Sequence, residues 1–400
     1  MSKPTAGQQY TVQNGDTLER IASIAYGDPS RSRDIENANQ INQLIPGIIL
    51  RLPPEDQTAP QITSDGLVLI VDGIEIQTES LRFFESLETI ADGWTAVIAW
   101  TPLEKPELDA AIRPYHYGNA NIFLDRELLG TGRLYLTHTG LKGRQQAVLE
   151  CWSIAADFVD STLQPPYEEN NVTLLQRAET LAKPFFLEVI SKLDQDGIFD
   201  RVTATEEQTA GSHLLDLAKQ RGALVSSTEF GEILISVPNP SGEPVATIEE
   251  GVEGFSGFEA KFDGRKRFSD YRMIGETAFD GPNNAVSKDQ AVTVTRFKTK
   301  TVNDTTVGEI QRAADWEKTK FLSEALTLPI SARGFKAPNG KRWKKGDYVI
   351  LISPTLFIND GFTMLIKSVE FLDDSNGETS LLTLVPPSVY SGDEIEEPWL

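Results

Sequence analysis

The segment at residues 343–387 reads WKKGDYVILISPTLFINDGFTMLIKSVEFLDDSNGETSLLTLVPP. Three apolar runs lie in and just after it: YVILIS at 348–353, FTMLIKSVEFLD at 362–373 and TSLLTLVPPSVY at 379–390. Runs of β-branched and aliphatic residues separated by polar turns predict β-strands. We therefore expect a β-rich region in this part of the chain.

The same pattern recurs nearer the start of the chain. LVLIVDGIEIQT at 67–78 predicts a hairpin that turns at Asp72-Gly73. Further strand-like segments follow up to about residue 154: WTAVIAWTP, ANIFLDREL, GRLYLTHTG and AVLECWSI. Two separate β-rich regions are therefore predicted.

Helical patterns lie between and within these regions. Helices are predicted from Thr173 in TLLQRAETLAKPF and from Gly211 in GSHLLDLAKQRG, where Gly222 ends the helix. The segment 307–326 predicts a long amphipathic helix. Its expected buried positions are Ile310, Ala313, Ala314, Trp316, Phe321 and Leu322. The order β, then α/β, then β predicts an α+β fold rather than a doubly wound one.

The first 53 residues predict a small separate module. A strand at 9–13 precedes a helix that Asp16 and Thr17 can cap, a second helix covers about 32–39, and a strand at 48–52 closes a βααβ unit. The Pro- and Thr-containing segment 54–66 then predicts a linker.

The stretches YTVQNGDTL, AYGD, NQIN and IPGIILRLP resemble the LysM domain, a module that binds cell-wall sugar chains. The resemblance implies a peptidoglycan groove between two loops. Its candidate residues are Gly15, Asp16, Thr17 and Leu18 on one side, and Ile41, Asn42, Leu44, Ile45 and Pro46 on the other. The second loop, INQLIPGII, is shorter than the usual family pattern, so a module that packs without binding sugar is the alternative.

The chain is acidic, with a net charge of −22. Residues 1–60 hold five basic and seven acidic residues, so nearly all of this charge is in the remainder. Such a surface repels the phosphate backbone, which argues against tight nucleic-acid binding. No apolar run is long enough to span a bilayer, and the first ten residues are too polar for a secretory signal. A single cysteine fits assembly in a reducing cytoplasm.

No catalytic, metal or cofactor site is predicted. Cys151 lies in an apolar strand-like run and is expected in the core. The three histidines, His116, His138 and His213, are isolated and form no zinc motif. DQDG at 194–197 lacks the later glutamate of a calcium loop and is expected to be a turn.

The ordered series CWSIAADFVDST, LLDLAKQRGALVSSTEFGEILIS, GRKRFSDYRMIGET and the stretch from AADWEKTKFLSEAL to LTLVPPSVY resembles the baseplate hub of contractile phage tails. The family is that of Mu-like tail protein P and late control protein D. Its most telling part is Trp343, Gly346 and Asp347 with the ending LTLVPP. The resemblance implies two β-barrel-like hub domains at 67–155 and 256–390, an α/β middle region at 156–255 and an acidic tail at 391–400.

The same resemblance implies a structural protein of the virion tail baseplate, assembled in the host cytoplasm. Three copies would form a pseudo-sixfold ring between the central spike and the tail tube or its initiator, beside the baseplate wedge proteins. DNA would pass through it without specific binding, and nothing would insert in a membrane. A LysM-targeted peptidoglycan hydrolase and a wall-binding adhesin are the alternatives.

The basic stretches and the acidic tail could have a structural role or contact a partner. The basic stretches GRKRF (264–268) and KRWKK (341–345) are either solvated turns or contacts to an acidic neighbour in the ring. Trp94, Trp100 and Trp152 are expected in the core. In the tail DEIEEPWL, Trp399 and Leu400 are candidate partner-docking residues, and the four acids disfavour folding onto an acidic body.

Overall fold

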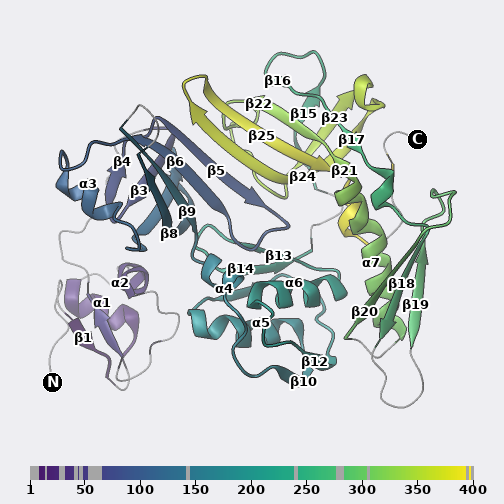
Figure 1. Ribbon diagram of the computed structural model, residues 1–400, viewed down its shortest axis with the longest axis horizontal. Coiled ribbons are helices and arrows are strands. Elements are labelled where there is room, and N and C mark those ends of the chain that lie inside the picture. Colours follow the sequence, from purple (N-terminus) through teal and green to yellow (C-terminus); the bar gives the residue numbers. More distant parts are fainter. Residues whose placement is uncertain are drawn as a thin grey trace.

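The computed structural model describes residues 9–13, 16–26, 32–39, 44, 48–52, 65–140, 145–237, 242–275, 283–303, 307–392 and 396–397. This part of the chain is mostly β, with a large curled sheet above a group of helices (Figure 1). A small N-terminal unit and a side unit built on a long helix complete it. No helix in these ranges is both long and apolar enough to cross a membrane.

The large sheet has thirteen strands in the order β16-β22-β25-β24-β5-β6-β9-β8-β7-β3-β4, and β15 and β23 extend from β24. Its first part comprises β3 Leu67–Val71, β4 Ile74–Ile76, β5 Ser80–Ser86, β6 Gly93–Ala99, β7 Asn119–Leu124, β8 Glu127–Thr139 and β9 Gln146–Ser153. Its second part comprises β15 Pro244–Glu249, β16 Phe255–Ser256, β22 Pro329–Arg333, β23 Tyr348–Ser353, β24 Ile358–Asp374 and β25 Gly377–Val385. Short helical segments, α3 Pro106–Ala111 and η4 Pro354–Leu356, connect strands at its borders.

The two β-rich regions form one sheet because β5 pairs with β24. The pairing is antiparallel and runs from Ser86 opposite Ser368 to Leu81 opposite Asp373. Phe83 stacks on Phe371 across this joint, and both side chains are fully buried. A single buried cluster therefore spans both regions. The strand β15, which falls in the range 156–255, and β16, which straddles the end of that range, pair with β23 and β22 of this sheet.

The predicted hairpin is confirmed, since β3 pairs antiparallel with β4. Asp72 and Gly73 both have positive φ, at 47° and 81°. Two consecutive positive φ angles are those of a type I′ turn, which Asp-Gly favours.

The middle unit has its own core under two helices. It comprises α4 Ala156–Asp160, β10 Glu168–Val172, α5 Leu174–Ala182, η2 Lys183–Phe185, β11 Val189–Ser191, β12 Phe199–Thr203, α6 Ala210–Gln220, β13 Leu224–Ser227 and β14 Ile233–Ser236. β14 pairs parallel with β11 and antiparallel with β13. Both predicted helices are present, and Gly222 follows α6 with φ of 65°. Its buried side chains, such as Phe158 and Leu214, form a cluster separate from that of the large sheet.

The side unit is a three-stranded sheet, with β18 Asp270–Gly275 between β19 Asn284–Lys288 and β20 Phe297–Val302. Helix α7 (Val307–Ala325) packs on one face of it. The predicted buried positions of this helix are confirmed for Ile310, Ala313, Ala314, Trp316 and Phe321. The Leu322 side chain lies outside the described residues. Around this unit lie β17 Lys261–Phe262, η3 Gly264–Lys266, β21 Leu326–Thr327 and η5 Pro387–Tyr390.

The N-terminal unit comprises β1 Gln9–Thr11, α1 Leu18–Tyr26, α2 Ser32–Asn39 and β2 Ile49–Arg51. β1 pairs antiparallel with β2, and Tyr10, Ile21, Ile35 and Leu50 form a small buried core. These elements follow the predicted order of strand, helix, helix and strand.

The core prediction for the tryptophans is wrong for one of them. Trp94 is buried and Trp100 is half-buried, but Trp152 is 42% exposed. Cys151 points into the core, so strand alternation turns the next residue to the outer face. There the indole of Trp152 lies over Gly93 of the neighbouring strand, where a Cβ would meet the ring at 2.8 Å.

Candidate functional site

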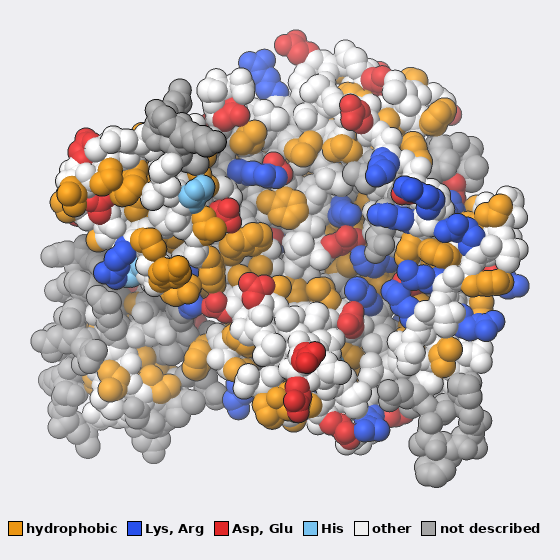
Figure 2. Space-filling model, viewed as in Figure 1, with side chains coloured by type: hydrophobic (Ala, Val, Ile, Leu, Met, Phe, Trp, Pro, Cys, Tyr) orange, Lys and Arg blue, Asp and Glu red, His pale blue; other side chains and the backbone are white. Residues whose placement is uncertain are grey.

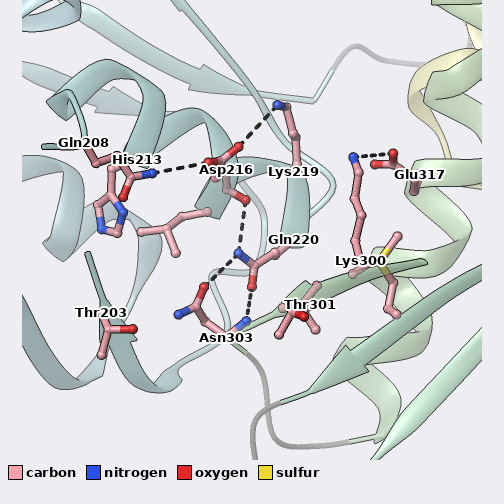
Figure 3. Close-up of a pocket in the computed structure, with 14 residues that line it drawn as sticks. Thr203, Gln208, His213, Asp216, Lys219, Gln220, Lys300, Thr301, Asn303 and Glu317 are labelled. Carbon is pink, nitrogen blue, oxygen red and sulfur yellow. Dashed lines mark hydrogen bonds and ion pairs between the residues drawn. The ribbon is translucent and has the colours of Figure 1, made fainter. Parts of the chain in front are cut away.

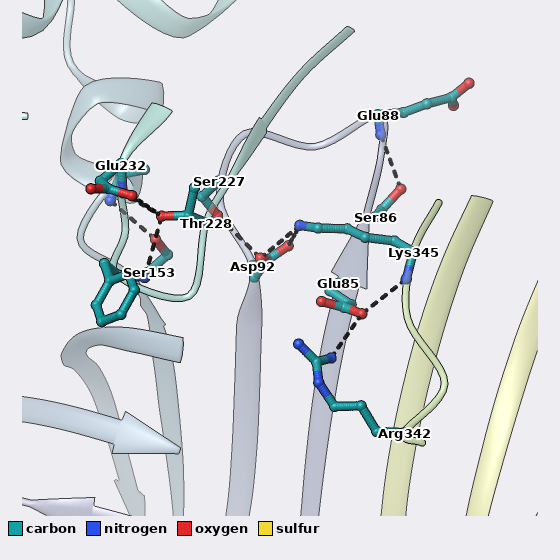
Figure 4. Close-up of polar contacts among 12 residues, drawn as sticks. Glu85, Ser86, Glu88, Asp92, Ser153, Ser227, Thr228, Glu232, Arg342 and Lys345 are labelled. Carbon is teal, nitrogen blue, oxygen red and sulfur yellow. Dashed lines mark hydrogen bonds and ion pairs between the residues drawn. The ribbon is translucent and has the colours of Figure 1, made fainter. Parts of the chain in front are cut away.

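A buried ion pair joins three parts of the chain. Lys345, just before β23, places its Nζ 2.9 and 2.8 Å from the two carboxylate oxygens of Asp92, just before β6. Ser227 of the middle unit donates its hydroxyl to the same carboxylate at 3.1 Å. The side chains of Lys345 and Asp92 are only 8% and 6% exposed. Figure 4 shows the strands that bring these groups together.

A second carboxylate lies beside this pair. Glu85 of β5 accepts a hydrogen bond from the backbone N–H of Lys345 at 3.0 Å, and Arg342 Nη1 lies 3.4 Å from it. Burial raises the pKa of Asp92; Lys345 opposes this shift and the charge of Glu85 adds to it. Two acids and two bases from opposite ends of the chain therefore balance one another in the interior.

Glu88 makes a comparable junction between the sheet and α7. Its Oε1 accepts hydrogen bonds from Lys320 at 3.0 Å, Ser323 at 3.0 Å and the Tyr390 hydroxyl at 2.7 Å. Burial opposes ionisation, but Lys320, Lys367 and Tyr390 outweigh it and lower the pKa of Glu88 to about 2. Glu88 is thus an ionised anchor for α7 and η5.

A pocket of about 350 Å³ lies between α6 of the middle unit and the side unit (Figure 3). Polar pairs within the chain occupy its wall. Gln220 and Asn303 exchange two hydrogen bonds, at 3.2 and 2.7 Å, and Lys300 pairs with Glu317. The Gln220–Asn303 hydrogen bonds tie the middle unit to the side unit, whereas the Lys300–Glu317 pair lies within the side unit.

The histidine at this wall, His213, lies beside a buried arginine. Burial and the guanidinium of Arg177 lower the pKa of His213 to about 4, so the ring is neutral at pH 7. Arg177 Nε lies 3.4 Å from His213 Nε2 and its Nη1 pairs with Glu169. His213 therefore belongs to a buried polar network.

The cysteine and the possible metal ligands of the described ranges can be placed directly. Cys151 is buried as predicted, and burial raises the pKa of its thiol well above the usual range. No group of three or more His, Cys, Asp or Glu residues there could hold a metal ion. The ion pairs around Asp92 and Glu88 connect structural units of the chain.

Two parts of the chain match models of baseplate proteins. Residues 155–237, the middle unit, match the second domain of the baseplate hub protein gp44-like family. Residues 306–393 match the fourth domain of the Mu phage baseplate assembly protein GpP. Two separate parts of the chain are therefore similar to domains of phage baseplate proteins.

Solved structures share the fold over most of the chain. The 43 kDa tail protein of prophage MuSo2 from Shewanella oneidensis has a TM-score of 0.68 at 22% identity, covering 82% of this chain and 99% of that one. A tail protein from Neisseria meningitidis MC58 has the same TM-score at 21% identity, covering 80% and 96%. Prophage tail protein gp18 from Listeria monocytogenes EGD-e has a TM-score of 0.52 at 13% identity, covering 80% and 94%. No curated protein matches the chain.

Only part of the predicted peptidoglycan groove is described. Asp16 accepts hydrogen bonds from the Tyr10 hydroxyl at 2.7 Å and the Gln13 N–H at 2.8 Å. Thr17 accepts from the Arg20 N–H at 3.2 Å and so caps α1, as predicted. Leu18 and Leu44 pack against the core of the unit. Gly15, Ile41, Asn42, Ile45 and Pro46 lie outside the described residues.

Both basic stretches make ion pairs within the chain. In KRWKK, Arg342 and Lys345 hold Glu85 and Asp92. In GRKRF, Arg265 pairs with Asp263, and Arg267 pairs with Asp289 and Glu397. Sequence reasoning missed these partners, because nothing in the spacing links residues that lie up to about 250 positions apart.

The acidic tail is folded onto the body at one described point, which corrects the expectation that its charge prevents this. The Glu397 side chain is only 7% exposed, and its carboxylate pairs with Arg267. Although the chain as a whole is acidic, Arg267 of the basic stretch GRKRF compensates the negative charge of Glu397. Trp399 and Leu400 lie outside the described residues, so their docking role stays a prediction.

DQDG at 194–197 lies in the loop between β11 and β12, with a bend at Asp194 rather than the predicted turn, and it has a structural function. Asp196 accepts the N–H groups of Leu174 and Leu175, at 3.0 and 2.8 Å. These are the first two residues of α5, whose N–H groups have no partner within the helix. This loop residue thus caps a helix that lies earlier in the chain.

Proposed function

We propose that this chain is the structural hub of a contractile phage tail baseplate or a related injection machine. The observation that carries the proposal is the match of two separate parts of the chain, in order, to domains of baseplate hub and assembly proteins. The fold shared with phage tail proteins over about 80% of the chain supports it.

Three copies would form the ring that joins the central spike below to the tail tube above, in contact with the wedge proteins. Each chain contributes two β-rich parts, so a trimer presents six, which suits a threefold-to-sixfold junction. The net charge of −22 suits a passage that DNA crosses without adhering, because a cationic lumen would hold phosphates.

The N-terminal unit would act as a LysM adaptor that packs on baseplate neighbours or touches peptidoglycan. The order of its elements supports this assignment. A pull-down with insoluble peptidoglycan tests the sugar contact: retention of residues 1–60 would support it, and their full recovery in the supernatant would leave only the packing role.

The hub proposal is tested on the purified full chain. We expect a trimer by sedimentation and a ring with a six-lobed outline by electron microscopy. A monomer at high concentration, with no ring in the particle, would overturn it. Clearing of a cell-wall suspension would instead favour a hydrolase.

A further inference from the structure

Basic residues concentrate in one part of this acidic chain. Residues 261–303 contain nine Lys and Arg against five Asp and Glu, whereas the whole chain has a net charge of −22. In Figure 2, Lys and Arg side chains gather on the side of the molecule that holds α7, β17, β18 and β20. A local excess of this kind can attract a surface of opposite charge.

The sheet of the side unit presents part of this charge outward. Tyr271 and Met273 point to α7 and are buried, so the alternation of β18 turns Arg272 to the opposite face, where it is exposed. The strand register places Lys288 and Phe297 on either side of Asp270 on that same outward face. Phe297 is 68% exposed. We call this surface, with the adjoining Lys266 of η3, the basic face.

The basic face is net positive, because it carries Lys266, Arg272 and Lys288 against the single carboxylate of Asp270. Within the described ranges, no carboxylate lies within ion-pair distance of Lys266, Arg272 or Lys288. Their neighbours differ, because Arg265, Arg267 and Lys300 each pair with an acid of the same chain. The cations of the basic face are therefore available to a partner.

The complementary surface lies on the middle unit. Residues 155–237 contain fourteen acidic and six basic residues. Glu206 and Glu207, adjacent in the loop between β12 and α6, are exposed there, and no described base forms an ion pair with either. The chain thus carries two different patches of opposite charge.

We propose that the basic face of one copy docks on the acidic middle unit of the next copy. The inference rests on the proposed function, in which copies form a ring. Contact between two different patches is heterologous, and repeated heterologous contacts close into a ring when the rotation allows it. Opposite charge sets the orientation, and the exposed Phe297 adds apolar contact. A nucleic-acid partner is disfavoured, because the acidic body repels phosphates.

Charge reversal in the full chain tests the contact. The variant R272E/K288E should weaken self-association by about tenfold or more, measured as the dissociation constant by analytical ultracentrifugation. K105E/K341E makes the same charge change at exposed lysines elsewhere and should associate like the wild type. R272E/K288E/E206K/E207K exchanges the charges of both patches and should restore association. Salt should weaken the wild-type contact and the exchanged contact alike.

The outcomes distinguish failure of the proposed contact from failure of the hub proposal. A trimeric R272E/K288E with the wild-type dissociation constant would overturn the contact and leave the hub proposal standing. A wild type that is monomeric at all concentrations would overturn both. Loss of duplex DNA binding in R272E/K288E, with unchanged association, would make the face a nucleic-acid surface and overturn the proposal. The exchanged variant excludes misfolding as the cause of weaker association.

Discussion

Lys345 contacts the Asp92 side chain through its Nζ and Glu85 through its backbone N–H. We expect Lys345→Met to lower the free energy of unfolding by about 3–5 kcal/mol, because it leaves a buried charge without its partner. Urea unfolding at pH 7 measures this. Lys344→Met is the matched control, since Lys344 is exposed, and should change stability by at most about 0.5 kcal/mol. Equal unfolding midpoints for the two variants would contradict the role of the ion pair.

The lowered pKa of Glu88 makes the stability of the protein depend on pH in the acid range. Its folded pKa of about 2 lies below the ordinary value, so its ionised form stabilises the fold above about pH 4.5. This contribution is lost as the pH falls toward 2, when the carboxylate is protonated. Glu88→Gln should therefore cost about 3 kcal/mol at pH 7. The difference from the wild type should shrink at pH 3; a constant difference across this range would show that the charge is not what matters.

Single residues could be predicted where their own neighbours in the sequence decide their environment. The apolar run around Cys151 placed it in the core, and the spacing of α7 placed Trp316 there. The core prediction for Trp152 was wrong, because its neighbour Cys151 points into the core and adjacent residues of a strand point to opposite faces. The ion pairs could not be predicted, since Asp92 and Lys345 meet only after the whole sheet has formed.

Among the elements, α5 depends on a cap from outside itself. Thr173 and Gln176 form a capping box, and Asp196 adds two hydrogen bonds to the first turn. Asp196→Ala should lower stability by about 1–2 kcal/mol and speed amide exchange in α5. The neighbouring Asp194 is exposed, so Asp194→Ala should be within about 0.5 kcal/mol of the wild type. Equal exchange rates in α5 for both variants would count against the cap.

Helices and strands were predicted better than their pairing. Local propensity and periodicity reveal a strand such as β24, but its partner β5 lies nearly 300 residues away. The joint between the two β-rich regions is set by their complementary core faces, which no local pattern encodes. The same holds for β15, whose parallel partner β23 follows it by about 100 residues.

At the scale of the whole molecule, the N-terminal unit has its own core and a predicted linker separates it from the large sheet. Removing residues 1–60 should therefore leave the remaining chain folded and trimeric. The thermal midpoint and the sedimentation mass of the truncated chain check this. A broad or absent thermal transition would show that the unit belongs to the body.

The last prediction concerns how the tail connects this chain to its assembly. The ion pair between Glu397 and Arg267 holds the tail against the side unit, so the segment that follows leaves from a fixed point. Fully burying Trp399 and Leu400 in a partner would supply about 3–5 kcal/mol. Deleting residues 398–400 should thus leave the melting temperature and the trimer unchanged, because the ion pair remains, and should lower the yield of assembled baseplates. Glu396→Gln changes the tail without removing the anchor and should assemble normally. If the deletion variant assembles in full yield, the tail has no docking role.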